Sequence, residues 1–332
     1  MPLDRHAERF LEMLAAAGQA RGGYDHVSER RQALKNLTAL ADPPVTTPVG
    51  GAHDHLMRVA GGNLLLRVYS PVGEPARLLP GMVFLHGGGW VAGSVETHDG
   101  LCRRLCNESG CRLVAVEYRL APEHQFPVGL NDCCMALAYV RRNAREFGID
   151  PVRLGIGGDS AGATLAAAVC QIAREAGDPP PAFQLLLCPI LDVAGEAASR
   201  RELREGYFLD HETLVRDLEL YCPGAALDDP RLSPLRAADF AELAPAFIHT
   251  AQFDPFGDEG EAYARHLSAA GVTVHGRTHS GMIHFFYAMP QMIPYAQEAV
   301  AVIGAEVRYA MKLPRPRDRR AQMRTRPELI RE

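Results

Sequence analysis

The chain has 332 residues, of which 47% are hydrophobic and 23% charged, and its formal net charge is −5 at pH 7. This length and apolar content suffice for one large α/β domain with an insertion, or for two ordinary domains. The mild acidic charge, without a long basic stripe across the core, argues against a nucleic-acid partner. The best apolar run, Phe183 to Ile190, is interrupted by Pro189 and is too short to span a bilayer, so we expect no stable membrane insertion.

The segment from Met1 to Glu12 carries charged residues early and contains no uninterrupted apolar stretch, so we expect no secretory signal. Eight cysteines are present, but no two of them form a C-x-x-C pair, and most lie inside apolar patterns. Cysteines in such positions behave as small hydrophobic residues. We therefore expect reduced thiols in a cytoplasmic protein, with neither disulfides nor a metal site.

The first elements in chain order are helical. Apolar residues recur at helical spacing around Phe10 and again around Leu37, and Gly22-Gly23 separates the two patterns before Pro43-Pro44 ends the segment. From His53 onward, apolar residues recur at every second position, which is typical of a β-strand. Strand patterns at 53–59 and 64–69 flank a Gly-Gly-Asn turn, which predicts a β-hairpin.

Downstream of the hairpin, short apolar strands alternate with helices of ten or more residues. The predicted strands are Met82 to Leu85, Leu113 to Tyr118, the run that ends at Gly158, Phe183 to Cys188, Ala246 to Thr250 and Val272 to His275. The predicted helices are His98 to Glu108, Pro127 to Phe147, the run after Gly162, Glu259 to Ala270 and Ala296 to Met311. This alternation predicts an α/β fold in which a mainly parallel sheet is covered by helices on both faces.

One stretch interrupts the alternation, because residues 192–234 read as helical and charged with no strand. We expect this stretch to be an insertion that packs with the N-terminal helices as a cap over the strand ends. The expected units are N-terminal cap helices at 1–50, core at 51–191, cap insertion at 192–234, core again at 235–313, and a basic tail at 314–332. The tail lacks periodicity, so we expect it to be disordered or loosely attached.

A candidate nucleophile lies between a predicted buried strand and an Ala-rich helical pattern. Residues 158–162 read Gly-Asp-Ser-Ala-Gly, the G-x-S-x-G pattern in a strand–turn–helix context. Small flanking residues allow strand and helix to pass closely, while the turn exposes the hydroxyl of Ser160 near free helical N–H groups. The alternative interpretation is an ordinary glycine-rich turn.

A serine nucleophile needs a base and an orienting carboxylate, which in this arrangement follow it along the chain in the order acid, then histidine. Asp254 follows a predicted strand and precedes Pro255, so we favour it over Asp192, and over Asp258, which helix capping would explain. Among the downstream histidines at 266, 275, 279 and 284, the last two lie after the final predicted strand. We favour His284, which has apolar flanks, and expect a structural role for His279.

An oxyanion hole is expected at the glycine run His86-Gly87-Gly88-Gly89, which follows a predicted strand. Without Cβ atoms, the N–H groups of Gly88 and Gly89 can approach a carbonyl oxygen, and Ala161 after the nucleophile supplies another donor. A phosphate loop is the alternative, but no Gly-Lys-Ser/Thr follows. A dinucleotide fingerprint is also disfavoured, because the run does not lead into a helix.

Together these motifs resemble the bacterial hormone-sensitive-lipase-like esterases of family IV. The resemblance is carried by His86-Gly87-Gly88-Gly89-Trp90, Tyr118-Arg119-Leu120-Ala121-Pro122-Glu123-His124, Gly158-Asp159-Ser160-Ala161-Gly162, Asp254-Pro255 and Gly281-Met282-Ile283-His284. It implies an α/β-hydrolase fold with a helical cap, a triad of Ser160, Asp254 and His284, and oxyanion donors at Gly88, Gly89 and Ala161. The chain departs from the family at Ala163 and Phe285, where the family often has glycine. The second change places a bulky ring beside the base.

We therefore expect a serine carboxylesterase that hydrolyses short- to medium-chain esters through an acyl-enzyme. It needs no cofactor and no metal, its partner is a small-molecule ester, and relatives that it resembles often form homodimers. An amidase or formamidase with the same triad is one alternative, and a non-catalytic small-molecule receptor on this scaffold is another. Acyl-chain preference should depend on cap side chains near Tyr207, Phe208 and Leu209.

Overall fold

The structure is a computed structural model that describes residues 1–16, 26–43, 47–73 and 78–313. The Gly22-Gly23 break between the first two helices and the basic tail from residue 314 lie outside these ranges. Helices α1 (Arg5–Ala16) and α2 (Val27–Ala41) agree with the two expected N-terminal helices. None of the helices within the described ranges is long and apolar enough to cross a bilayer.

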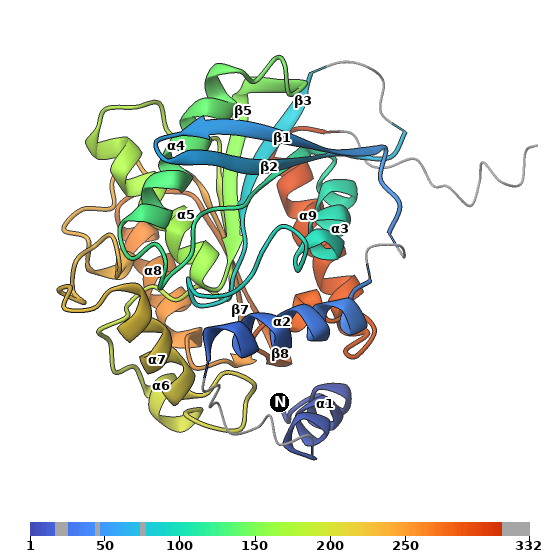
Figure 1. The fold of residues 1–332 in the computed structure, drawn as a ribbon, viewed down its shortest axis with the longest axis vertical. Helices are drawn as coiled ribbons and strands as arrows, with labels where there is room; N and C mark the ends of the chain where they lie inside the picture. The colour runs from blue at the N-terminus through green and yellow to red at the C-terminus, as the bar shows by residue number, and fades with distance from the viewer. Residues whose placement is uncertain (17–25, 44–46, 74–77, 314–332) are drawn as a thin grey trace, which may run out of the picture.

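The described residues contain one eight-stranded sheet in the order β1-β2-β4-β3-β5-β6-β7-β8 (Figure 1). Its strands are β1 (Gly51–Val59), β2 (Gly62–Ser70), β3 (Leu79–Leu85), β4 (Arg112–Val116), β5 (Ile149–Asp159), β6 (Gln184–Leu187), β7 (Ala246–Phe253) and β8 (Val274–Ile283). The β1–β2 hairpin pairs antiparallel and joins the sheet antiparallel to β4, whereas the pairs from β4 to β8 are all parallel. The expected fold class, a mainly parallel α/β sheet, is confirmed.

Helices cover both faces of the sheet, α4, α5 and α8 on one face and α3 and α9 on the other (Figure 1). Their bounds are α3 (Asp99–Ser109), α4 (Val128–Arg142), α5 (Ala161–Glu175), α8 (Gly257–Ala269) and α9 (Tyr295–Ala310). The remaining helices are α6 (Ala198–Glu202) and α7 (His211–Tyr221), with the 3-10 turns η2 (Pro234–Arg236) and η3 (Phe286–Ala288). Residues 192–234 thus form α6, α7 and turns without a strand.

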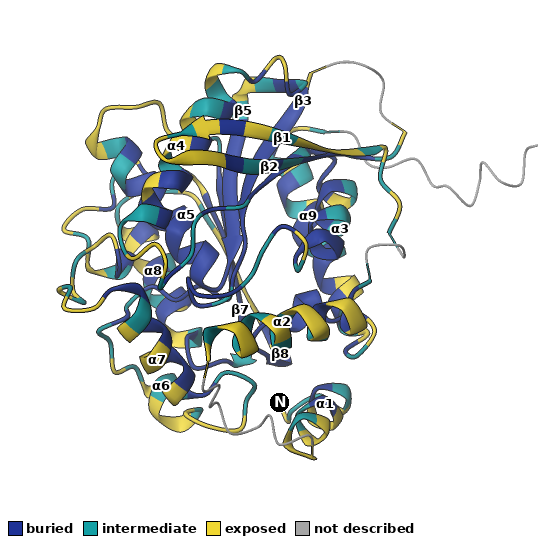
Figure 2. Ribbon diagram, viewed as in Figure 1, coloured by how far each residue is buried: buried dark blue, intermediate teal, exposed yellow. Residues whose placement is uncertain are grey.

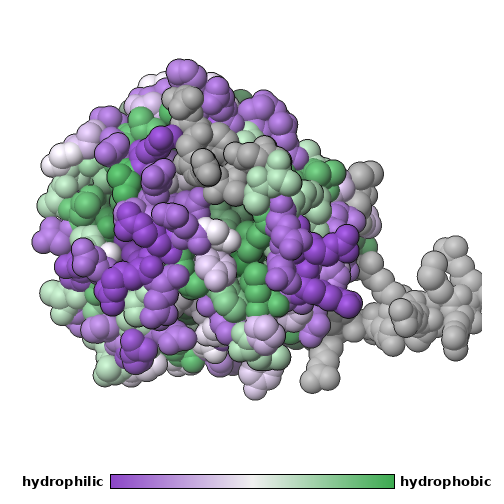
Figure 3. Space-filling model, turned by 90° about the horizontal axis from the view of Figure 1, so that it is seen from below, coloured by the Kyte–Doolittle hydropathy of each residue, from purple (hydrophilic) through white to green (hydrophobic). Residues whose placement is uncertain are grey.

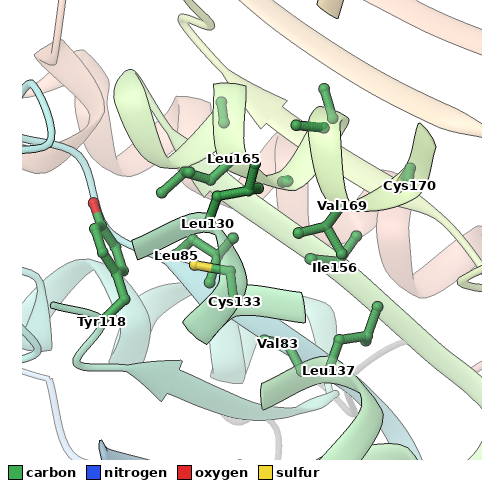
Figure 4. Close-up of a cluster of buried hydrophobic side chains, with 14 of the residues drawn as sticks. Val83, Leu85, Tyr118, Leu130, Cys133, Leu137, Ile156, Leu165, Val169 and Cys170 are labelled. Carbon is green, nitrogen blue, oxygen red and sulfur yellow. The ribbon is translucent and has the colours of Figure 1, made fainter. Parts of the chain in front are cut away.

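The central strands are buried on both faces, which explains their continuous apolar sequences (Figure 2). In β3 the side chains alternate between two cores, because successive residues of a strand point to opposite faces. Val83 and Leu85 join the cluster beneath α4 and α5, while Met82 and Phe84 join the cluster beneath α3 and α9. Figure 4 shows the first cluster, in which strand residues meet Leu130 and Leu137 of α4 and Leu165 and Val169 of α5.

Two predicted boundaries are wrong. Strand β8 runs to Ile283, well beyond the predicted end at His275, because it pairs with β7 through Ala251↔His279 and Phe253↔Ile283. Its polar stretch is exposed at the edge of the sheet, so no apolar alternation marks it in the sequence. Helix α4 ends at Arg142 instead of Phe147, and tight turns follow up to Gly148, which has a left-handed φ of 65°.

Candidate active site

Ser160 lies at the turn between β5 and α5 with φ 52° and ψ −123°, a region that non-glycine residues rarely adopt. Two hydrogen bonds hold this backbone: the N–H of Ser160 donates to the carbonyl of Leu187 (2.8 Å), and its carbonyl accepts from the N–H of Thr164 (3.1 Å). The surrounding sheet and helix therefore over-determine the strained turn, as expected of a nucleophile elbow.

The two glycines that flank the turn are required by close approach. A Cβ at Gly158 would overlap the carbonyl group of Gly162, and a Cβ at Gly162 would overlap the carbonyl oxygens of Leu85 and His86. Strand β3, the turn and the start of α5 thus meet backbone to backbone. The glycine spacing seen in the sequence is a consequence of this contact.

The structure brings Ser160, Asp254 and His284 together, although 124 residues separate the first from the last. The Nε2 atom of His284 lies 2.9 Å from the Oγ atom of Ser160, and its Nδ1 atom lies 2.9 Å from Oδ2 of Asp254. With Nδ1–H donating to the carboxylate, Nε2 is free to accept the serine proton. This is the hydrogen-bonding order that a serine nucleophile and its base require.

All three side chains are almost fully buried, with relative exposures of 6% for Ser160, 1% for Asp254 and 3% for His284. Asp254 follows β7, and its Oδ1 atom accepts the N–H of Phe256 at 2.9 Å. Both carboxylate oxygens therefore have fixed partners. The ring of Phe256 packs edge-on against His284 at a centroid distance of 5.7 Å, which restricts the orientation of the imidazole.

The rejected acid candidates have other partners. Asp192 forms an ion pair with Arg236 at 2.6 Å. Asp258 does not cap its own helix, contrary to expectation, because α8 has no side-chain cap; instead its Oδ2 atom accepts the N–H of Ser199 at the start of α6 (2.9 Å). Asp258 therefore connects the core to the inserted helix α6, and Asp192 connects the start of the insertion to η2.

The other histidine candidates lie away from Ser160. His266 and His275 are exposed on α8 and β8. His279 lies within β8 and not on the expected loop, and it shares hydrogen bonds with His249 (3.2 Å) and Tyr295 (3.1 Å). Burial, and then the positive charges of His249 and Arg277, lower the pKa of His279 to about 3. The ring therefore remains neutral, in keeping with the structural role expected of it.

The glycine run lies beside Ser160. Gly88 and Gly89 have φ values of 121° and 63°, both in the left-handed region, and both line the same pocket as Ser160. The carbonyl of Gly88 accepts the N–H groups of Val91 and Ala92, which folds the loop back on itself. Among the described residues, no hydrogen bond uses the N–H groups of Gly88, Gly89 or Ala161. These donors are available for an anionic oxygen.

A pocket at Ser160 lies between α1, α2 and α7. Its lining is Leu14, Arg30, Ala33, Leu34, Leu37, Gly88, Gly89, His98, Asp159, Ser160, Ile190, Phe208, Leu209, Asp210, Thr213, Leu214, Asp217, His284 and Phe285. On this face of the molecule, hydrophobic side chains gather in a strip between hydrophilic areas (Figure 3). Phe208 and Leu209 line the pocket as expected, whereas Tyr207 stacks on Phe253 outside it.

The departure at Phe285 has a structural consequence. Phe285 has φ 65°, a conformation that favours glycine and strains a bulky residue. Its ring stacks on Phe208 with a centroid distance of 6.0 Å and an interplanar angle of 5°, and Phe208 in turn contacts Phe10 of α1. An aromatic stack therefore joins the residue after His284 to the helices above the pocket.

Sequence reasoning missed two ion pairs that line this pocket. Arg30 of α2 binds Asp217 of α7 through two hydrogen bonds of 2.9 and 2.6 Å, and His98 faces Asp159 at 3.2 Å. Burial raises the pKa of Asp217 to about 6, which the charge of Arg30 opposes. The sequence does contain one indication of the Arg30–Asp217 pair. Asp217 lies on the apolar face of its helix between Leu214 and Leu218, where a buried carboxylate needs a partner.

The eight cysteines are free thiols in the structure, and seven of them are buried. Cys188 lies closest to the candidate triad: its sulfur and the ligand atoms of Asp254 and His284 lie within 4.8 Å of one another. Burial, and then the negative charge of Asp254, raise the pKa of the Cys188 thiol well above its ordinary value. It therefore remains a neutral thiol.

Comparisons with known proteins show which family this chain belongs to. A family model described as alpha/beta hydrolase fold matches residues 82–288. Carboxylic ester hydrolase LipN of Mycobacterium tuberculosis is 40% identical over 238 residues, which span 70% of this chain and 63% of LipN. An arylesterase of Saccharolobus solfataricus is 36% identical over 310 residues, 92% of this chain and 98% of the relative.

Solved structures of ester hydrolases are also similar to this chain. The ester-hydrolase EH1AB1 from the metagenome of Lake Arreo, solved in complex with a derivative of bipyridine phosphonate, superposes with a TM-score of 0.89 at 38% sequence identity. The match covers 93% of this chain and 99% of EH1AB1. The similarity therefore extends over most of the chain.

Proposed function

Because the chain belongs to the α/β-hydrolase fold family and is a carboxylic ester hydrolase, we propose that Ser160, Asp254 and His284 are its catalytic triad. The observation that carries the proposal is the position of His284, whose two ring nitrogens lie 2.9 Å from the serine hydroxyl and 2.9 Å from the carboxylate. The family resemblance expected from the motifs is confirmed.

In the proposed reaction, the Oγ atom of Ser160 attacks the ester carbonyl while Nε2 of His284 accepts its proton. Asp254 holds the imidazole in the required tautomer and stabilises the imidazolium that forms. The tetrahedral oxyanion accepts hydrogen bonds from the N–H groups of Gly88, Gly89 and Ala161. The alcohol then leaves with the proton from His284, and water repeats the sequence on the acyl-enzyme. This mechanism uses only these groups and needs no cofactor or metal.

The proposed substrates are esters with short- to medium-chain acyl groups. The pocket wall near His284 consists of the stacked rings of Phe285 and Phe208, which limit the room beside the base. Leu34 and Leu37 of α2 add an apolar wall above. A glycine at position 285 would leave this space open, so the chain's own sequence supports a short acyl site.

We propose that α1, α2, α6 and α7, from segments 1–50 and 192–234, form a cap over a core made of 51–191 and 235–313; these four are called the cap helices below. Residues of α1, α2 and α7 line the pocket over Ser160, which supports this division. The cap helices meet at the Arg30–Asp217 ion pair, so the two segments contact each other as well as the core.

The proposed setting is the cytoplasm, with small esters as partners and no nucleic acid. Free thiols at all eight cysteines support a cytoplasmic location, and the net charge of −5 argues against a nucleic-acid partner.

A homodimer is a further proposal, supported by the exposed edge of β8, which can pair with another strand. Light scattering of the purified protein tests it.

The decisive experiment replaces the nucleophile. Ser160→Ala should fold normally and reduce hydrolysis of p-nitrophenyl acetate to background, and a fluorophosphonate should label the wild type at Ser160 and leave the variant unlabelled. Ser268→Ala, on the exposed face of α8, is the matched control and should retain activity and labelling. Full activity in Ser160→Ala would refute the triad, and a series of esters and matched amides on the same protein separates esterase from amidase.

A further inference from the structure

A second histidine–carboxylate pair lies next to the glycine run, in the same pocket as Ser160. Asp159 precedes the nucleophile and His98 precedes α3, and their relative exposures are 0% and 1%. The Nε2 atom of His98 lies 3.2 Å from Oδ2 of Asp159. Both residues line the pocket, yet the proposed ester hydrolysis assigns neither of them a role.

The contacts of the Nδ1 atom of His98 fit a protonated nitrogen. Its partner, 2.9 Å away, is the Oγ1 atom of Thr97. That hydroxyl already donates its own proton to the carbonyl of Ser94 (3.0 Å) and accepts the N–H of Ser94 (2.9 Å). With its proton directed to that carbonyl, the hydroxyl accepts a hydrogen bond from Nδ1–H of His98.

The Nε2 atom of His98 must also be a donor. The Oδ1 atom of Asp159 accepts the N–H of Gly87 at 2.9 Å. The other oxygen, Oδ2, faces Nε2. A carboxylate oxygen only accepts hydrogen bonds, so Nε2 bears a proton as well. With both ring nitrogens protonated, His98 is an imidazolium and forms a buried ion pair with Asp159.

The neighbouring groups agree with a positive charge at His98. His86 donates its Nδ1–H to the carbonyl of Gly87 (2.9 Å), and burial, followed by the charge of His98, lowers the pKa of His86 to about 3, so that ring is neutral. The other charged groups that act on His98 are Asp42 after α2 and Glu117 after β4, both acidic. The ring of Phe285 packs against His98 in a T-shaped arrangement with a centroid distance of 5.6 Å.

The position of the pair explains why the charge matters. Asp159 ties Gly87 to the elbow, and this tether holds the next two glycines beside Ser160. A lone carboxylate at that place would oppose the negative charge that develops on the substrate oxygen a few ångströms away, because such interactions are weakly screened in a buried site. The imidazolium of His98 removes this conflict.

We propose that His98 and Asp159 are positioning residues for ester hydrolysis: the carboxylate anchors the glycine run, and the imidazolium of His98 neutralises it so that the oxyanion hole remains electrostatically favourable. This inference rests on the proposed triad and oxyanion donors. It assigns to the pair a role in rate and not in substrate affinity, since the negative charge on the substrate oxygen develops only in the transition state.

A double-mutant cycle tests the proposal. His98→Gln retains an N–H donor but no charge, so Asp159 is left unneutralised, and kcat should fall on the order of 10- to 100-fold with little change in KM. Asp159→Asn keeps the acceptor for Gly87 and gives His98 a neutral partner, so its loss should be smaller. In His98→Gln/Asp159→Asn no charge remains, and kcat should recover to the level of Asp159→Asn alone.

The pH profile of kcat/KM gives the second readout. In His98→Gln the uncompensated carboxylate should move the acid limb upward, by about 1 pH unit, and the double variant should restore it. His266→Gln, an exposed histidine on α8, is the control and should match the wild type. Additive losses in the double variant, or an unmoved acid limb in a folded His98→Gln, would overturn the proposal. Fluorophosphonate labelling of wild-type Ser160 shows separately whether the triad itself stands.

Discussion

The strand-end site and the cap helices above it are built in different ways. At the strand ends, the backbone fixes the candidate catalytic groups: Ser160 is held by a strained turn between β5 and α5, and Asp254 by a loop bond to Phe256. The cap helices reach the site through side chains instead, chiefly the Arg30–Asp217 pair and the Phe208–Phe285 stack. The difference suggests that changes in the core should destroy chemistry, whereas changes in the cap should alter stability and substrate choice.

The largest effect is expected where backbones touch in the core. In Gly162→Ala the new methyl group would overlap the carbonyl oxygens of Leu85 and His86, which no rotamer change can relieve. We expect about 3 kcal/mol or more of destabilisation and loss of esterase activity, measured by urea unfolding and p-nitrophenyl acetate hydrolysis. Gly276→Ala on β8, where a Cβ meets nothing within 4 Å, is the control. An active, stable Gly162→Ala protein would show that close backbone contacts do not fix the strand-end site, and the contrast with the cap helices would be wrong.

The next effect should come from the ion pair between the cap helices. Asp217→Ala leaves the largely buried guanidinium of Arg30 without its partner and should cost about 2 to 3 kcal/mol in the free energy of unfolding. KM should rise because α2 and α7 lose their connection, while kcat should change less. Arg30→Met/Asp217→Leu, which removes both charges, should regain most of the stability. If kcat alone falls in Asp217→Ala, the cap takes part in the chemistry and the contrast between the regions is wrong.

A pH effect is expected from the core histidine His279. Because burial lowers its pKa to about 3, the folded state binds fewer protons than the unfolded state below pH 6.5, so this contribution to stability is present above pH 6.5 and is lost as the pH falls toward 3. Between pH 7 and pH 4.5 the loss should be about 2 kcal/mol. In His279→Gln, urea unfolding at the two pH values should show a smaller difference than in the wild type. An unchanged difference would assign the acid sensitivity to other groups.

The smallest change in stability, with the clearest change in specificity, is expected at the junction of the two regions. Phe285→Gly loses the stack on Phe208 but relieves a left-handed φ, so the two effects, each about 1 kcal/mol, should largely cancel. The opened space should raise kcat/KM for decanoyl relative to acetyl p-nitrophenyl esters. Tyr207→Ala, whose ring stacks on Phe253 outside the pocket, should leave this ratio unchanged. A ratio unaffected by Phe285→Gly would show that the stack does not limit the acyl site.

The sequence by itself determined the features that depend on local backbone rules. Strand–helix alternation identified the α/β sheet, because apolar periodicity reports burial directly. The glycines at 158 and 162 identified the elbow, since a turn that tight tolerates nothing larger. The order of acid and histidine after Ser160 reduced the candidates to a few residues near strand ends, where side chains from different strands converge.

Only the tertiary structure decided the long-range relations. The polar edge strand β8 exists because it pairs with β7, and no periodicity marks it. His98 and Asp159 are 61 residues apart, and Arg30 and Asp217 are 187 residues apart. A buried charge shows in the sequence only as an acid among apolar residues, as at Asp217, and its partner is chosen by how the chain folds. For this reason the candidate nucleophile could be identified from the sequence, while the charged residues that surround it could be identified only from the fold.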